Sequence, residues 1–167
     1  MDGDLDLAVK EAHAFFRERR LTVSAAESCT GGLLSHYLTA LPGSSDFFEG
    51  GVVSYSKRMK RSILGVAEET LSSHGAVSRE TAIEMALRMR EVAGTDFAVA
   101  TTGNLGPGAL EDKETGLVYI AVSGGKGTEV RELRLAGGRD ENRRRACLEA
   151  LRFLLESASG RGEDAPR

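Results

Sequence analysis

A short polar stretch around Ser28 could hold a nucleophile. It reads Glu27-Ser28-Cys29-Thr30-Gly31-Gly32 and stands between a strand-like segment and a helical pattern. A serine in such a turn can project its hydroxyl into a cleft, and backbone N–H groups near Thr30, Gly31 and Gly32 could stabilise a developing oxyanion. A structural role is equally compatible with this pattern, because Ser28 or Thr30 could cap the following helix.

Tyr55 and Lys60 flank a second junction between a strand and a helix. Tyr55 ends the expected strand, and Lys60 stands about one turn into the helix that follows. A serine needs a base to remove its proton, and no histidine motif is suitably placed. A buried lysine with a lowered pKa is therefore the available base. The alternative is that Lys60 belongs to a solvated basic face formed with Lys57, Arg58 and Arg61.

A third polar segment follows the apolar run at 97–100. Its residues include Thr102, Gly103, Asn104 and Gly106, whose backbone amides could cradle an anionic group. The loop could also be no more than a tight connection, and it matches neither the P-loop nor the GxGxxG pattern. Since ligands of open α/β sheets bind beyond the carboxyl ends of strands, three polar strand ends together indicate a site.

Alternating helices and strands would position these loops. Helical spacing of apolar residues is found at 4–20, 33–41, 57–64 and 78–93 and again in the C-terminal part of the chain. Strands are expected at 21–26 with one buried face, at 52–55, at 97–100, and at 117–122 paired in a hairpin with 130–135. We predict a single three-layer α/β/α domain with a mixed sheet over residues 1–156, followed by a disordered tail at 157–167.

Composition excludes several classes of protein. The 167 residues suit one domain, and a net charge of −3 gives no reason to expect a nucleic acid or an anionic membrane as partner. No apolar run reaches the roughly 20 residues of a membrane span, and the N-terminus lacks signal-peptide features. We therefore expect a cytoplasmic protein with both cysteines reduced. Scattered histidines and the absence of a CxxC motif argue against a metal site.

Several separated motifs, taken in order, resemble the CinA C-terminal domain family. They are AESCTGG, GGVVSYSKRMKRSILGV, LSSHGAVS, TTGNLGPG and GLVYIAV, which together extend over roughly residues 5 to 155. Members of this family are amidases that convert nicotinamide mononucleotide to nicotinate mononucleotide and ammonia, in the salvage of pyridine nucleotides and without a metal or organic cofactor. The resemblance implies that Ser28 is the nucleophile, Lys60 its base and Tyr55 a partner in the same network.

A mononucleotide substrate would also need a receptor for its phosphate. One candidate is the amide-rich loop at 103–108, and the other is the run at 137–140 that opens the C-terminal helix. We expect Arg139 to bind the phosphate, with the loop amides assisting, because an arginine at a helix N-terminus suits an anion. Arg143 is four residues further on and could share its face. The chain departs from the family pattern next to this loop, at Asn104-Leu105 and at 113–116.

Two functions remain open at this point. The first is a serine amidase that acts on a small-molecule mononucleotide. The second is a non-catalytic nucleotide-binding or interaction module linked to competence or DNA damage. The combination of Ser28, Tyr55 and Lys60 favours the enzyme, because a binding module has no need of that trio. A homo-oligomer is compatible with either function, since domains of this family commonly self-associate.

Overall fold

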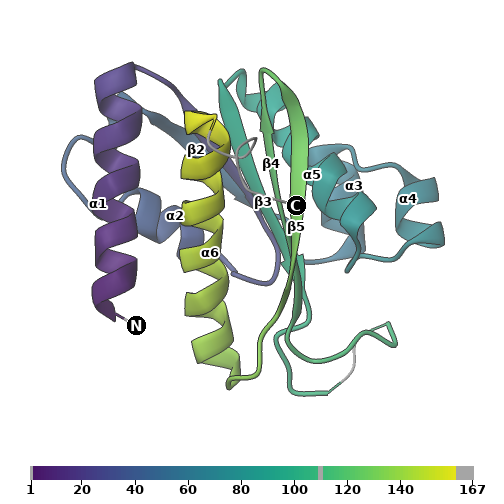
Figure 1. Ribbon diagram of the computed structural model, residues 1–167. Helices are drawn as coiled ribbons and strands as arrows, with labels where there is room; N and C mark the ends of the chain where they lie inside the picture. Colours follow the sequence, from purple (N-terminus) through teal and green to yellow (C-terminus); the bar gives the residue numbers. More distant parts are fainter. Residues whose placement is uncertain (1, 109–110, 161–167) are drawn as a thin grey trace.

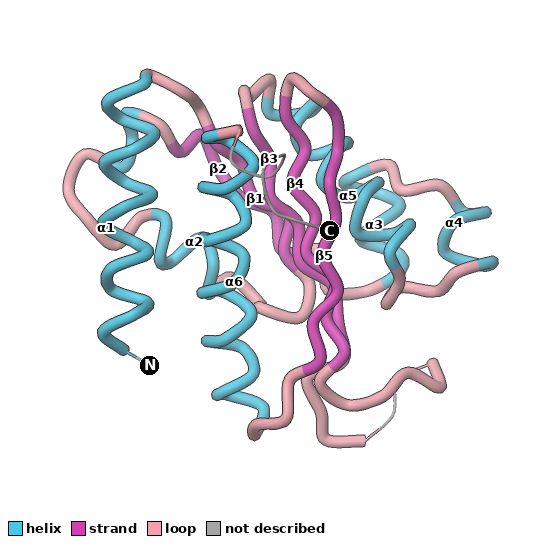
Figure 2. Tube along the Cα trace, in the orientation of Figure 1, coloured by secondary structure: helices cyan, strands magenta, loops and turns pink. Residues whose placement is uncertain are grey.

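A mixed five-stranded sheet forms the centre of the computed structural model, which describes residues 2–108 and 111–160 (Figures 1 and 2). The strands are β1 (Val23–Glu27), β2 (Phe48–Val53), β3 (Phe97–Gly103), β4 (Leu117–Gly124) and β5 (Gly127–Arg134). Their order across the sheet is β2-β1-β3-β4-β5. β1 runs parallel to both β2 and β3, whereas β4 pairs antiparallel with β3 and β5. The predicted mixed sheet and its hairpin are confirmed.

The helices cover both faces of this sheet. One layer contains α1 (Asp2–Arg19), α2 (Leu33–Leu38) and α6 (Arg139–Ser159), and the other contains α3 (Lys57–Leu64), α4 (Glu68–Ser73) and α5 (Arg79–Ala93) (Figure 1). A short 3-10 helix, Ser44–Asp46, precedes β2. Each layer has its own apolar core, with Phe16 and Leu151 fully buried in the first and Met85 in the second. The predicted three-layer α/β/α domain is confirmed.

Local sequence signals set the bounds of the two helices nearest the site. Ser78 caps α5, because its hydroxyl accepts a hydrogen bond from the Thr81 amide at 3.1 Å. Gly94 ends that helix with a left-handed backbone at φ 64°, and Gly65 ends α3 in the same way at φ 73°. The bounds predicted for both helices are confirmed.

Three predicted features differ from the structure. All five residues of β1 are buried, because β1 is an inner strand with helices on both faces, so its predicted single buried face is wrong. β2 ends at Val53, which leaves Tyr55 in the connection to α3. The tail predicted from 157 begins too early: α6 continues to Ser159, and the Ser157 hydroxyl donates to Glu129 at 2.7 Å. Residues 161–167 lie outside the described residues.

The order of the parallel strands brings their carboxyl ends together. From β1 the chain crosses one face through α2 to reach β2, then returns across the other face through α3, α4 and α5 to β3 (Figure 1). Because β2 and β3 lie on opposite sides of β1, the strand order reverses at β1, and the edge beyond its carboxyl end is a topological switch point. Such a point is the usual place for a ligand.

Candidate active site

A buried lysine contacts a buried serine at this edge. Ser28 directly follows β1, and Lys60 projects from α3 on the next crossover. The Lys60 Nζ lies 2.7 Å from the Ser28 Oγ and 2.7 Å from the Ser54 carbonyl oxygen. Lys60 is fully buried and Ser28 is 7% exposed. Lys60 therefore does not belong to a solvated basic face, and the structure brings the predicted nucleophile and base together.

The surroundings of Lys60 make its amine available as a base. Burial lowers the pKa of Lys60 from 10.5 to about 8, although the charge of Glu111 opposes this shift. None of the ion pairs among the described residues includes Lys60. A neutral amine can accept the proton of the Ser28 hydroxyl, so the pair can act as base and nucleophile in weakly alkaline solution.

Glu27, which the sequence analysis did not single out, shapes the loop that carries Ser28. Its side chain is fully buried at the end of β1. Its carboxylate accepts hydrogen bonds from the hydroxyls of Thr30 and Ser35 and from the amides of Gly32, Leu34 and Ser35. Glu27 thus satisfies the N-terminus of α2, and the alternative that Ser28 or Thr30 caps this helix is wrong. A carboxylate six residues before a helix is not a known N-cap pattern, so this role of Glu27 could not be predicted from the sequence.

The backbone amides of the same loop divide into engaged and available groups. The Gly31 amide donates to the Ser28 carbonyl at 3.1 Å, and the Gly32 amide donates to Glu27. These two glycines therefore do not supply the expected oxyanion donors. In the described part of the chain, no hydrogen bond joins the amide of Cys29 or of Thr30 to a protein oxygen. They directly follow Ser28 and are the donors that an oxyanion could use.

Cys29 does not compete with Ser28 as a nucleophile. Its side chain is buried, and burial raises the pKa of its thiol to about 12. A thiol with this pKa carries almost no thiolate near neutral pH, and the thiolate is the reactive form. Cys29 and Cys147 are both free, as predicted.

Tyr55 and Arg139 meet at the rim of the site. Tyr55 is 59% exposed, and its hydroxyl accepts a hydrogen bond from the Arg139 guanidinium at 2.8 Å. The other terminal nitrogen of Arg139 donates to the Gly106 carbonyl. The Tyr55 hydroxyl therefore contacts Arg139, the residue predicted to bind the phosphate, and it makes no hydrogen bond to Ser28 or Lys60. Its expected place in the proton-transfer network is not found.

Arg143 holds the nucleophile loop from the same helix. Its Nε and Nη2 atoms lie 3.3 and 3.0 Å from the Thr30 carbonyl oxygen. Arg139 and Arg143 are four residues apart at the start of α6, and they reach the two loops on either side of the site. The expectation that they share a face of the helix agrees with these contacts.

The loop after β3 is braced mainly by its own side chains. The Asn104 amide group donates to the carbonyls of Gly108 and Lys113, and its oxygen accepts from the Gly106 amide at 3.1 Å. Asn104, where the chain departs from the family pattern, thus acts as an internal brace rather than as a free ligand. The Thr102 hydroxyl is also engaged, because it donates to the Ala76 carbonyl at 2.6 Å.

Gly103 has a packing role in the same loop. It lies at the end of β3, and a Cβ there would stand 2.7 Å from the Leu117 carbonyl oxygen. Of the residues that were expected to bind substrate in this loop, Thr102, Asn104 and the Gly106 amide are already bonded within the protein. The loop therefore shapes the rim, and Arg139 is left as the charged group that could meet an anion.

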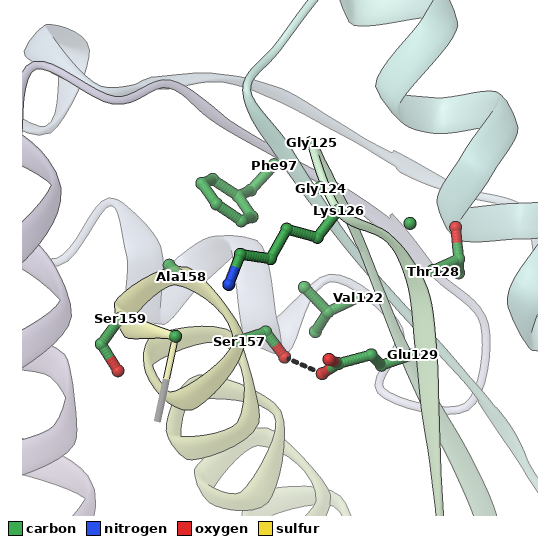
Figure 3. Close-up of a pocket in the computed structure, with 12 residues that line it drawn as sticks. Phe97, Val122, Gly124, Gly125, Lys126, Thr128, Glu129, Ser157, Ala158 and Ser159 are labelled. Carbon is green, nitrogen blue, oxygen red and sulfur yellow. Dashed lines mark hydrogen bonds between the residues drawn. The ribbon is translucent and has the colours of Figure 1, made fainter. Parts of the chain in front are cut away.

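A separate hollow lies at the opposite end of the sheet. It opens between the hairpin at 124–129 and the last turn of α6, with Lys126 and the Ser157–Glu129 hydrogen bond on its wall (Figure 3). Phe97, the first residue of β3, also lines it. It contains neither Ser28 nor Lys60, so it is distinct from the candidate active site.

The described residues contain neither a cluster of metal ligands nor a helix that could span a membrane. No group of three or more His, Cys, Asp or Glu side chains among them could hold a metal ion. None of their helices has both the length and the apolar character needed to cross a bilayer.

Comparison with known proteins identifies the family. Residues 6–158 match the model of the CinA C-terminal domain. The chain belongs to the CinA C-terminal domain family. A relative from Acetivibrio thermocellus, named a competence-damage inducible protein, is 51% identical over 135 residues, which are 80% of this chain and 33% of the relative. One from Bacillus subtilis with the same name is 42% identical over 148 residues, 89% of this chain and 36% of the relative. The chain thus spans about a third of the length of these relatives.

Solved structures of CinA proteins share the fold. A competence/damage inducible protein, CihA, from Agrobacterium tumefaciens superposes with a TM-score of 0.87 at 40% identity, covering 91% of this chain and 94% of that one. A CinA superfamily protein from Escherichia coli gives a TM-score of 0.90 at 30% identity, with 94% and 92% covered. The family expected from the sequence motifs is confirmed.

Proposed function

We propose that this CinA domain is a serine amidase that hydrolyses nicotinamide mononucleotide to nicotinate mononucleotide and ammonia. The observation that carries the proposal is the contact of the Lys60 Nζ with the Ser28 Oγ at 2.7 Å, inside the protein and without a carboxylate partner for the lysine among the described residues. The activity belongs to pyridine-nucleotide salvage in the cytoplasm and needs no cofactor.

The first chemical step would be acylation of Ser28. Neutral Lys60 removes the proton of the Ser28 hydroxyl while the Oγ attacks the carboxamide carbon. The negative charge that develops on the carboxamide oxygen meets the amides of Cys29 and Thr30. When the tetrahedral intermediate collapses, the carbon–nitrogen bond breaks, and the Lys60 ammonium returns its proton to the departing nitrogen, which leaves as ammonia.

The second step would be hydrolysis of the acyl-enzyme. Lys60 is again neutral and removes a proton from the incoming water, which attacks the ester carbon. The carbon–oxygen bond to Ser28 then breaks, and the lysine proton restores the serine hydroxyl. Arg139 stands at the rim, where its guanidinium can bind the phosphate of the substrate by exchanging its contacts with Tyr55 and Gly106.

The direct test is ammonia release by the purified chain. We expect release from nicotinamide mononucleotide, with nicotinate mononucleotide formed in equal amount, and weaker release from the nucleoside that lacks the phosphate. If the mononucleotide binds but no ammonia appears over a range of pH that includes 8 to 9, the proposal fails and the non-catalytic binding module takes its place.

A further inference from the structure

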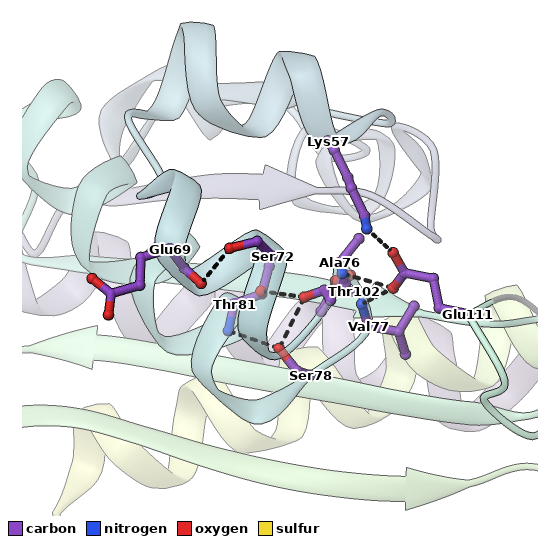
Figure 4. Close-up of polar contacts among 10 residues, drawn as sticks. Lys57, Glu69, Ser72, Ala76, Val77, Ser78, Thr81, Thr102 and Glu111 are labelled. Carbon is purple, nitrogen blue, oxygen red and sulfur yellow. Dashed lines mark hydrogen bonds and ion pairs between the residues drawn. The ribbon is translucent and has the colours of Figure 1, made fainter.

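Glu111 joins α3, the helix that carries Lys60, to the connection between α4 and α5. Its carboxylate forms an ion pair with Lys57, the first residue of α3. It also accepts hydrogen bonds from the amides of Ala76 and Val77, at 2.7 and 3.3 Å, in the connection between α4 and α5 (Figure 4). The side chain is 21% exposed, so this carboxylate is largely removed from water.

The neighbouring residues show that this contact is built into the fold. Gly75 has φ 83°, and a Cβ there would lie 2.6 Å from the Glu111 Oε2, so only glycine leaves room for the carboxylate. The Ala76 carbonyl accepts the Thr102 hydroxyl, which ties the same connection to the end of β3 (Figure 4). The carboxylate therefore links α3 to the 75–77 connection, and that connection is bonded in turn to the end of β3.

We propose that Glu111 is a positioning residue for Lys60, which acts by holding the first turn of α3 through Lys57 and by placing a negative charge beside the lysine. Lys57 and Lys60 are three residues apart on a helix of eight residues, so they are neighbours on its surface. Fixing the first residue therefore fixes the direction in which the second points. A contribution of Glu111 to catalysis through Lys60 rests on the proposed amidase function.

The electrostatic part of this role has a definite sign. The charge of Glu111 acts against the burial that lowers the pKa of Lys60, so Glu111 keeps this pKa from falling further. Cys29, from the loop after β1, could act in this direction only as a thiolate, and with its raised pKa it is a neutral thiol where Lys60 titrates. Besides Lys57, the charged groups on the elements around Lys60 are Glu27 on β1, Arg58 and Arg61 on α3, Glu68 and Glu69 on α4, and Arg79, Glu80, Glu84, Arg88, Arg90 and Glu91 on α5.

The test is a direct titration of Lys60 by NMR in protein labelled with 13C-lysine. The chain contains five lysines, and the Lys60 signal is identified by its absence in Lys60→Arg. In Glu111→Gln, which keeps an acceptor for the two amides, we expect the Lys60 midpoint to fall by roughly 0.2–0.7 pH units. In Lys57→Met it should rise, because a nearby positive charge is lost and Glu111 is no longer neutralised.

The control is a second ion pair on the same helix. Arg61 and Glu68 form an exposed pair at 2.7 Å, and Glu68→Gln should leave the Lys60 midpoint unchanged. A merely structural role for Glu111 predicts the opposite sign, since loosening α3 would admit water and raise the midpoint in Glu111→Gln. A rise of the midpoint in Glu111→Gln, a fall in Lys57→Met, or no change in either variant would overturn the proposal.

Kinetics provide the second readout. With nicotinamide mononucleotide, the alkaline rise of kcat should move to lower pH in Glu111→Gln and to higher pH in Lys57→Met, in step with the NMR midpoints. The NMR result does not require turnover, so it still decides the role of Glu111 if the chain releases no ammonia. Midpoints that move as expected without any turnover would reject the amidase and keep Glu111 as the positioning residue.

Discussion

At one end of the sheet, where β1, β2 and β3 finish, a fully buried lysine touches a serine at 2.7 Å. At the other end, where β3 begins and β4 finishes, an open hollow has a lysine and a serine on its wall as well (Figure 3). There, however, the Ser157 hydroxyl donates to the Glu129 carboxylate. The two ends thus present the same residue types in opposite environments.

The difference lies in burial and in the partners of each side chain. Ser157 is bonded to an acceptor that does not take up its proton near neutral pH, since a carboxylate is a weak base. Ser28 faces an amine whose pKa burial has lowered to about 8. Burying a lysine ammonium away from water is unfavourable, so a buried lysine is retained where its position serves another requirement, such as function. A buried lysine beside a serine therefore indicates chemistry more strongly than an open hollow does.

The largest effect should come from replacing one of the two serines, Ser28, by alanine. We expect Ser28→Ala to reduce ammonia release from nicotinamide mononucleotide by at least about a thousandfold, because Ser28 is the hydroxyl to which Lys60 is hydrogen-bonded among the described residues. Ser157→Ala is the matched control at the opposite end of the sheet and should stay within about twofold of the parent chain. Comparable turnover in both variants would remove the distinction between the two ends.

Replacing the two lysines should give the next largest effect. Lys60→Arg retains a positive charge but cannot become a base, so kcat should fall by roughly a hundredfold to ten-thousandfold. Lys126→Arg, in the hollow, should have no such effect. In the parent chain the rate should rise with pH through a midpoint near 8, since only neutral Lys60 is active. A rate that does not vary between pH 7 and 9 would argue against Lys60 as the base.

Arg139→Ala tests the rim of the candidate active site and should have a smaller effect. It removes a charge-assisted contact to the phosphate, so the KM for the mononucleotide should rise by roughly tenfold to a hundredfold. The KM for the phosphate-free nucleoside should change much less. Arg152→Ala, further along the same helix in an exposed pair with Glu149, serves as the control. Equal losses on both substrates would show that Arg139 does not bind the phosphate.

The last effect is on stability rather than on turnover. The folded-state pKa of Lys60, about 8, lies below its ordinary value of 10.5, so between these values the unfolded chain binds more protons than the folded one. The free energy of unfolding should therefore rise with pH across this window, by up to about 3 kcal/mol relative to Lys60→Met. Urea unfolding of both chains at pH 7.5, 9 and 10.5 measures the difference. If the free energy of unfolding changes with pH equally in both chains, the Lys60 ammonium does not destabilise the folded state.

Local patterns in the sequence were sufficient for much of this description. Ser78 and Gly94 delimit α5, and Gly65 ends α3, because caps and left-handed glycines act within a few residues of themselves. The polar segments at three strand ends were expected to meet at one edge of the sheet, and they do, since parallel strands bring their carboxyl ends together. The pairing of Ser28 with Lys60 followed from the family resemblance, and their separation of 32 residues gives no local signal.

Only the tertiary structure decided how each of these groups is used. Glu27 binds the start of α2 from the end of β1, which leaves the Ser28 hydroxyl to Lys60 and occupies the Gly32 amide. Tyr55 bonds Arg139, from the far end of the sequence, instead of the serine. Hydrogen-bond partners and burial depend on which elements meet in space, and those meetings follow from the strand order and the packing of whole layers.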